Sequence, residues 1–259
     1  MSEQTSPVVG RDLDAVLFDV GGVITIPDPV SLGAALAPLE ATATLVDLVR
    51  AHYVGMRAHA TSTLEGRGPW LDYIAAYLAE AGVPAERMDE AWRAFTRVFG
   101  HYCWRFPMVE TVTAMERLGE AQVLLGVVSN AIGQVEGLIR NLGLCQVGPG
   151  GGVPVEVVVD SGVVGVEKPD PAVFAPALEV MAARGVDPAR IGYVGDSLRY
   201  DVAGARAAGL VPLLLDPYDL YGGVDLGPGA HRIGSVHDLL PGPERPEADP
   251  AAQLEPEAD

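Results

Sequence analysis

One stretch near the start of the chain, residues 15–22 (AVLFDVGG), most constrains what the protein can fold into. Four apolar residues run directly into one carboxylate, Asp19, and the glycines Gly21 and Gly22 follow it. This pattern is typical of a buried strand that ends on an acid with bendable backbone behind it. In open α/β sheets the ligand crevice lies outside the carboxyl ends of the strands. Asp19 is therefore the first candidate for a site residue.

Alternating strand and helix patterns continue after Pro107. They predict strands at 123–130, 155–159, 191–194 and 211–215, separated by helices at 109–118, 132–142, 171–184 and about 200–208. Strands and helices of these lengths in alternation form βαβ units. We therefore predict an α/β protein with a Rossmann-like, mainly parallel sheet and helices on both of its faces.

Between these parts, the apolar residues of 26–105 recur at three- and four-residue spacing, which is typical of helices. The spacing predicts helices at 44–59, 70–81 and 86–101, and no strand. We expect an inserted all-helical subdomain at 26–105 and a core built from 11–25 and 106–240. The ends of the chain, 1–10 and 241–259, are expected to be disordered; the second mixes prolines with acids and has little to bury.

Charge and composition exclude several classes of protein. The 35 acidic and 17 basic residues give a net charge of -18, which disfavours binding to nucleic acid or to an anionic membrane. No apolar run is long enough to span a membrane and the N-terminus lacks signal-peptide features, so we expect a cytoplasmic protein. Cys103 and Cys145 have no companions at metal-binding spacing and are expected to be reduced thiols that pack in the interior.

Further polar residues lie at or just beyond predicted strand ends. Ser129 and Asn130 end one strand directly before a helix whose N-terminal amides can receive an anion. Asp196 ends another strand, and Asp201 follows five residues later. Lys168 is the only lysine of the chain. A compact ammonium suits a confined site where a point charge must approach a phosphate or a carboxylate.

Taken together and in this order, these elements resemble the motifs of the haloacid dehalogenase superfamily, in its subgroup with a helical cap inserted after the first motif. The resemblance covers about residues 13–240. The matching segments are Asp19–Val23, Ser129–Asn130, Lys168–Asp170, and Gly195–Ser197 with Asp201.

The resemblance implies covalent phosphoryl transfer to a small phosphorylated metabolite, with a sugar phosphate as one option. Asp19 would attack the phosphorus and carry an aspartyl phosphate, with Lys168 as the second catalytic residue. Mg2+ would be bound by Asp19, the backbone carbonyl of Gly21 and Asp196.

The same resemblance implies an anion site beside the nucleophile. Ser129, the amide of Asn130 and Lys168 would hold the phosphoryl oxygens. Behind them, Ser197 and Asp201 would support the site, with Asp201 orienting Lys168 or the water shell of the metal.

Gly21 departs from the pattern, because most phosphatases of the family have a second Asp at this position, which acts as general acid and base. General acid-base catalysis is typically worth about 100- to 10,000-fold. A protein that binds a ligand or partner without turnover therefore remains an alternative. A haloacid dehalogenase-type hydrolase is another, disfavoured by the metal-binding pattern at Asp196. A phosphonate-cleaving enzyme would need a lysine in the cap, and the chain has none there.

Substrate choice is expected to lie with the cap. The side chains that are candidates to face the site are Arg57, Arg67, Trp70 and Tyr73, together with His52 and His59. Arginine suits a second anionic group, and the rings suit a sugar or an aromatic ring. Alternatively, the rings pack between the cap helices and the charged residues lie on a solvated face. The sequence gives no oligomeric state.

Overall fold

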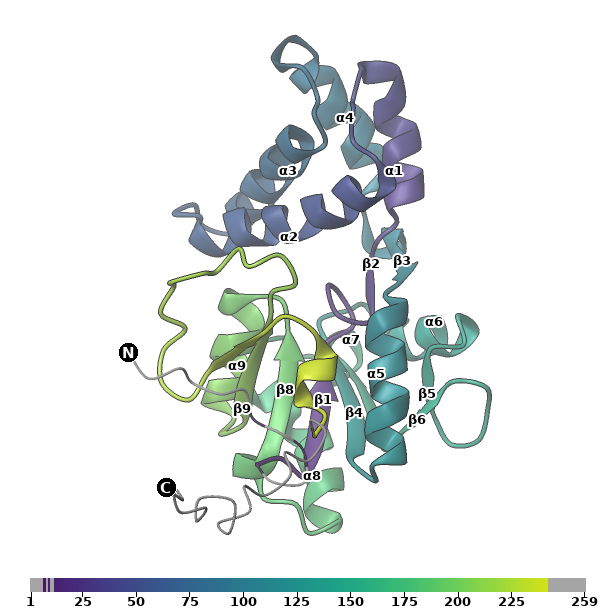
Figure 1. The fold of residues 1–259 in the computed structure, drawn as a ribbon, viewed down its shortest axis with the longest axis vertical. Helices are drawn as coiled ribbons and strands as arrows, with labels where there is room; N and C mark the ends of the chain where they lie inside the picture. Colours follow the sequence, from purple (N-terminus) through teal and green to yellow (C-terminus); the bar gives the residue numbers. More distant parts are fainter. Residues whose placement is uncertain (1–6, 8, 10–11, 242–259) are drawn as a thin grey trace, which may run out of the picture.

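The computed structural model describes residues 7, 9 and 12–241 (Figure 1). Apart from residues 7, 9 and 241, the two chain ends expected to be disordered lie outside these described residues. The centre of the fold is a six-stranded sheet in the order β10-β9-β8-β1-β4-β7, and all of its pairings are parallel. Its strands are β1 (Ala15–Phe18), β4 (Leu124–Ser129), β7 (Val157–Asp160), β8 (Ile191–Gly195), β9 (Val211–Leu215) and β10 (His231–Ile233). The predicted α/β fold class is confirmed.

Helices cover both faces of the sheet because the strands bury side chains in both directions. Val16 and Phe18 of β1 pack with α5 (Val109–Glu120) and α6 (Val135–Asn141) on one face. Leu17 of β1 packs on the other face with α8 (Ala175–Ala183) and α9 (Ala203–Ala207). The central strand β1 is therefore buried on both sides, as its unbroken apolar run indicated.

Several smaller elements complete this part of the chain. Two of them, β5 (Cys145–Val147) and β6 (Val153–Val155), form a separate pair of strands, and Cys145 is a buried free thiol. The short helices are α7 (Ser161–Val164), η4 (Pro171–Phe174), η5 (Pro188–Arg190), the π-helical η6 (Leu198–Val202) and η7 (Val236–Leu239).

Three predicted helix boundaries in this part were wrong. The predicted helix at 132–142 begins only at Val135. The predicted helix at 171–184 is a 3-10 turn, η4, followed by α8. A new helix begins there because Pro176, in the first turn of α8, has no N–H to continue the turn before it. The predicted helix near 200–208 begins earlier, at Leu198, where the Ser197 hydroxyl accepts a hydrogen bond from the N–H of Tyr200 at 3.2 Å.

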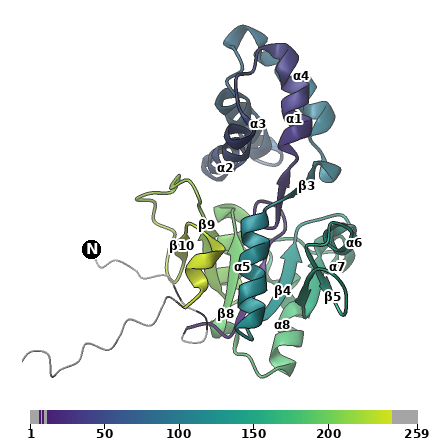
Figure 2. The ribbon, with the colours of Figure 1, turned by 45° about the vertical axis from the view of Figure 1, so that its right-hand side comes forward.

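Four helices lie together beyond one end of the strands of the sheet (Figures 1 and 2). They are α1 (Pro29–Leu36), α2 (Leu45–Thr61), α3 (Gly68–Glu80) and α4 (Met88–Val98), with the 3-10 turns η1 (Ala37–Leu39), η2 (Ala85–Arg87) and η3 (His101–Cys103). We call this set, residues 29–103, the helical unit. It has an apolar core of its own, in which Tyr73, Tyr77 and Phe95 are fully buried.

The prediction that 26–105 contains no strand was wrong at both ends. Strand β2 (Thr25–Pro27) leads into the helical unit and β3 (Trp104–Pro107) returns from it, and the two pair antiparallel. Figure 1 shows this pair between the helical unit and the sheet. Strands of three and four residues are too short for an alternating pattern to be visible in the sequence. Helix α1, which begins at Pro29 after its N-cap Asp28, also lies outside the predicted helices.

No helix within residues 12–241 combines the length and the apolar character that crossing a membrane requires.

The packing of β1 predicts a large stability loss for Leu17→Ala. Leu17 is fully buried. Its side chain packs so closely over Gly126 of β4 that a Cβ added to Gly126 would lie 2.6 Å from Cδ2 of Leu17. Truncation leaves a cavity between the sheet and the helices α8 and α9, and should lower the free energy of unfolding by about 2–5 kcal/mol. The measurement is urea unfolding followed by circular dichroism. Leu71→Ala on α3, where the leucine is 49% exposed, is the control and should change stability by about 0.5 kcal/mol or less. Equal losses in the two variants would contradict the prediction.

Candidate active site

The carboxyl ends of neighbouring parallel strands bring the predicted residues to one edge of the sheet. Asp19 follows β1, Ser129 ends β4, and Asp196 follows β8. Because β1 pairs with both β4 and β8, these side chains are neighbours. The N–H of Asp19 donates to the carbonyl of Val194 at 2.9 Å, which joins the end of β1 to β8. This edge of the sheet faces the helical unit, since Asp196 contacts α2.

Lys168 reaches the same edge from the loop between α7 and η4 and is almost completely buried. Its ammonium lies 3.0 Å from Asp19 Oδ1 and donates to Asp201 Oδ1 at 2.8 Å. It also donates to the hydroxyl of Tyr193 at 2.7 Å, and that hydroxyl donates to the carbonyl of Val128 at 2.7 Å. Sequence reasoning missed Tyr193, because a tyrosine within an apolar strand carries no sign that its hydroxyl meets a lysine.

The side chain of Asn130 holds the backbone of Lys168. Its Nδ2 donates to the Lys168 carbonyl at 3.1 Å, and its Oδ1 accepts from the Lys168 N–H at 2.8 Å. Burial raises the pKa of Asp19, and the hydroxyl of Ser129 counteracts part of that rise. Asn130, directly after β4, therefore holds the loop that carries Lys168, and Ser129 at the end of β4 acts on the candidate nucleophile.

Burial dominates the electrostatics of this site. It raises the pKa of Asp19 to about 6, although Lys168 pulls this pKa down, and Asp201 adds to the rise. Burial also raises the pKa of Asp196 and that of Asp201. For Lys168, burial alone would lower the pKa, but Asp19 and Asp201 outweigh it, so its pKa is raised and the group stays charged.

The donor set suits a hard divalent cation. Oxygens of Asp19, Asp196 and Asp201 all lie within 4.8 Å of one another, and all three residues are buried. One lysine cannot neutralise three ionised carboxylates, so the cluster has room for further positive charge. Carboxylate oxygens are ligands that Mg2+ prefers. Asp201 is already engaged through both oxygens, by Lys168 and by the N–H of Ser197 at 2.9 Å.

Two glycines are required by the close approach of these acids. Gly22 has φ +77°, and a Cβ there would lie 1.9 Å from Asp196 Oδ2. At Gly195, a Cβ would lie 2.2 Å from Asp201 Cγ. Any side chain at either position would displace a carboxylate of the cluster.

Most phosphatases of the family that the sequence resembles have a second acid at the position of Gly21. Here the indole ring of Trp104 occupies the space beside this glycine. A Cβ at this position would lie 3.0 Å from Cζ3 of Trp104, which belongs to β3. The six-membered part of the Trp104 ring therefore packs against the Gly21 backbone. The sequence alone did not link these residues, which are far apart in the chain.

The aromatic candidates of the helical unit form a continuous cluster. Trp70 has its ring 4.8 Å from that of His59 and 5.3 Å from that of Tyr73. His59 is fully buried, and burial, followed by the nearby Arg199, lowers its pKa to about 4. Tyr73 is also fully buried and reaches the site only indirectly, through a hydrogen bond to His52 at 3.0 Å.

The two arginine candidates lie outside this cluster. The guanidinium of Arg57 lies over the ring of Tyr221, 4.8 Å from its centroid. Arg67 is exposed at the start of α3. Among the described residues, neither arginine forms an ion pair with a carboxylate of the site. The structure therefore does not bring the two arginines together with the other predicted site residues.

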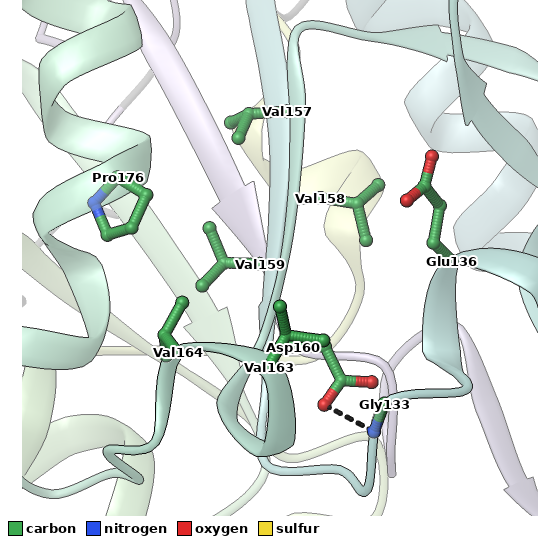
Figure 3. Close-up of a pocket in the computed structure, with 9 residues that line it drawn as sticks. All are labelled: Gly133, Glu136, Val157, Val158, Val159, Asp160, Val163, Val164 and Pro176. Carbon is green, nitrogen blue, oxygen red and sulfur yellow. Dashed lines mark hydrogen bonds between the residues drawn. The ribbon is translucent and has the colours of Figure 1, made fainter.

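A small pocket of about 160 Å3 lies elsewhere, along the edge strand β7 (Figure 3). Its lining residues are Gly133, Glu136, Val157, Val158, Val159, Asp160, Val163, Val164 and Pro176. Figure 3 shows the Asp160 carboxylate turned to the N–H of Gly133, which donates to it at 2.9 Å. The charged side chains that line this pocket are both acidic, so it offers no positive charge to bind a phosphate. The cluster around Lys168 is therefore the better candidate for a phosphate site.

Comparisons with known proteins place the chain among hydrolases. Residues 13–209 match the family model described as haloacid dehalogenase-like hydrolase. The chain is 30% identical over 186 residues to the mouse haloacid dehalogenase-like hydrolase domain-containing protein 3, a match that covers 69% of this chain and 68% of that protein. It is 34% identical over 167 residues to a phosphoserine phosphatase of Thermus thermophilus, covering 63% of this chain and 60% of the phosphatase.

Among solved structures, YfnB of Bacillus subtilis bound to magnesium has a similar fold. Its TM-score is 0.54 at 19% identity, and the alignment covers 88% of this chain and 97% of YfnB.

The raised pKa of Asp19 predicts how stability depends on pH when no metal is bound. Between its ordinary pKa of 3.8 and the folded value of about 6, the folded protein binds more protons than the unfolded chain. Stability should therefore fall as pH rises through this window. Asp19→Asn removes the buried charge, so at pH 8 it should be more stable than the wild type, by on the order of 1–3 kcal/mol.

The measurement is urea unfolding in chelator at pH 8 and at pH 4.5, where the difference should shrink. Asp89→Asn, at an exposed acid of α4, is the matched control and should show no such pH dependence. Equal stability of Asp19→Asn and the wild type at pH 8 would refute the explanation.

Proposed function

The chain belongs to the haloacid dehalogenase-like hydrolase family, and we propose that it is a Mg2+-dependent phosphatase that hydrolyses the phosphomonoester of a small metabolite. The observation that carries the proposal is the buried cluster in which Asp19, Asp196 and Asp201 surround Lys168. The similarity to a phosphoserine phosphatase supports the same class of reaction. Sugar phosphates and other small phosphomonoesters are the substrates to test first.

In this proposal Asp19 is the nucleophile. A carboxylate oxygen of Asp19 attacks the phosphorus, the bond from phosphorus to the ester oxygen breaks, and the leaving alkoxide takes up a proton. Water then attacks the phosphorus of the aspartyl phosphate, which releases inorganic phosphate and regenerates Asp19. Lys168 already lies 3.0 Å from Asp19, so its ammonium is placed to neutralise the incoming phosphoryl group.

Ser129, the backbone amide of Asn130 and Lys168 would hold the phosphoryl oxygens. Behind them, Asp201 orients Lys168 through the 2.8 Å contact with its ammonium. The Ser197 N–H in turn holds Asp201 at 2.9 Å. Lys168 and the end of β4 would thus receive the phosphoryl group on a preorganised surface.

Asp19, Asp196 and the backbone carbonyl of Gly21 would hold the Mg2+. When bound, the ion offsets the repulsion between the phosphate and the carboxylates and polarises the phosphoryl oxygens. The residues present fit this role, because the cluster offers hard oxygen donors and an excess of buried negative charge.

The helical unit would act as the cap, with residues 26–105 as the cap segment and 11–25 with 106–240 as the catalytic core. Two of the proposed specificity residues contact side chains that border the site, Trp70 through the ring of Trp104 and Tyr73 through His52. Arg57 and Arg67 remain proposed for substrates with a second anionic group.

Because Gly21 has no acidic side chain, the proton for the leaving group would come from water, from the substrate or from a residue of the cap. The competing function is therefore a protein that binds phosphorylated ligands or a partner without turnover. A dehalogenase-type hydrolase is less favoured, because it would not need the additional cation that the three acids can accept.

Phosphate release should depend on Asp19. A panel of sugar phosphates, nucleotides and other phosphomonoesters with Mg2+ should contain compounds from which the wild type releases phosphate over many turnovers. Asp19→Asn should reduce the release to background because the attacking carboxylate is lost, whereas Asp89→Asn should retain it. Full activity in folded Asp19→Asn would rule out this nucleophile. Ligand binding with no release by the wild type would favour the binding protein.

Turnover should also require the divalent ion. Excess chelator should abolish phosphate release and added Mg2+ should restore it, because the uncompensated carboxylates repel the phosphate dianion. The measurement is initial rate against free Mg2+ concentration for the best compound of the panel. Undiminished turnover in excess chelator would contradict the metal-dependent mechanism and would favour the dehalogenase-type alternative.

A further inference from the structure

A histidine of the helical unit contacts one of the site carboxylates directly. His52 lies on α2, and its Nε2 is 2.9 Å from Asp196 Oδ2. Its side chain is 1% exposed and that of Asp196 is 4% exposed. The contact therefore joins two buried polar groups across the boundary between the helical unit and the sheet.

The imidazole of His52 is fixed from its other side as well. Its Nδ1 lies 3.0 Å from the hydroxyl of Tyr73, on α3. The tyrosine ring lies so close to α2 that a Cβ at Gly55 would come within 2.6 Å of its Cδ2. A glycine is less favourable than alanine inside a helix, and here it permits this approach. Both ring nitrogens of His52 are thereby engaged, and the ring has a defined orientation.

A second contact of the same helix reaches the other loop of the site. The hydroxyl of Tyr53 donates to the carbonyl of Gly22 at 3.0 Å. Adjacent residues of α2 thus hold the backbone beside Asp19 and the side chain of Asp196. The ring of Trp104 lies 5.4 Å from that of His52 between centroids and is nearly perpendicular to it.

We propose that His52 is a positioning residue for the metal site: it holds Oδ2 of Asp196, so that the carboxylate keeps the orientation in which Oδ1 is available to a cation. The inference rests on the metal site of the proposed function. Hydrogen bonds from outside the ligand shell orient a ligating carboxylate, and their loss typically costs about 10- to 100-fold in metal affinity. Here the orienting group comes from the helical unit.

Metal affinity and the docking of the helical unit are consequently linked. In the arrangement of the structure, His52 holds Asp196 and the cation site is complete. Without that contact the carboxylate would be free to rotate. By thermodynamic reciprocity, a cation that binds the complete site more tightly also favours the docked unit.

The test is the binding of Mn2+ alone to the metal-free full chain, with free Mn2+ quantified by its electron paramagnetic resonance signal. His52→Ala should weaken binding by about 10- to 100-fold. Tyr73→Phe keeps the ring but removes the hydroxyl that orients His52, and should weaken binding by about 2- to 10-fold. His101→Ala, at an exposed histidine of the same unit, is the matched control and should leave the affinity unchanged.

Thermal melts monitored by circular dichroism establish that each variant is folded. Unchanged Mn2+ affinity in folded His52→Ala would overturn the inference, and so would tighter binding, which would mean that His52 competes with the cation. If His52→Ala does not fold, Tyr73→Phe decides: wild-type affinity in that variant would overturn the inference. A wild type that binds no Mn2+ would refute the metal-dependent function as well. Binding that is insensitive to both substitutions, with phosphate release intact, would refute the inference alone.

Discussion

The rest of the site depends on one electrostatic constraint, the burial of three carboxylates around a single ammonium. Asp19, Asp196 and Asp201 have oxygens within 4.8 Å of one another, and Lys168 contacts two of these residues. Such an arrangement is unfavourable by itself, because charges removed from water lose their hydration. Burial consequently raises the pKa of all three acids. A cation at this edge of the sheet would offset the excess negative charge of the three carboxylates.

Close packing then determines how the cluster is built. Gly22 and Gly195 allow the acids to lie directly against the backbone, where a methyl group would collide with them. Trp104 fills the space beside Gly21, so this side of the site is apolar where an acid would make it polar. Helix α2 covers the cluster and contacts it through Tyr53 and His52. The helical unit is therefore part of the site as well as its cover.

Much of the fold was predictable from local patterns. The apolar run that ends at Asp19 and the alternation after Pro107 indicated a parallel sheet, because buried strands and amphipathic helices leave periodic signals in the sequence. Asp19, Ser129 and Asp196 could be placed at one edge because the carboxyl ends of parallel strands lie together. The strands β2 and β3 could not be predicted, since each has no more than four residues and is defined by its partner.

The sequence by itself determined the class of fold, the strand ends that carry the polar residues, and the presence of a single lysine to meet them. Only the tertiary structure decided which distant residues complete the site. Tyr193 meets Lys168, Trp104 covers Gly21, and His52 holds Asp196 from 144 positions away in the chain. A tyrosine, a tryptophan and a histidine have the same local pattern whether they pack in a core or face a carboxylate. Their roles follow from contacts between segments, which no periodicity within one segment records.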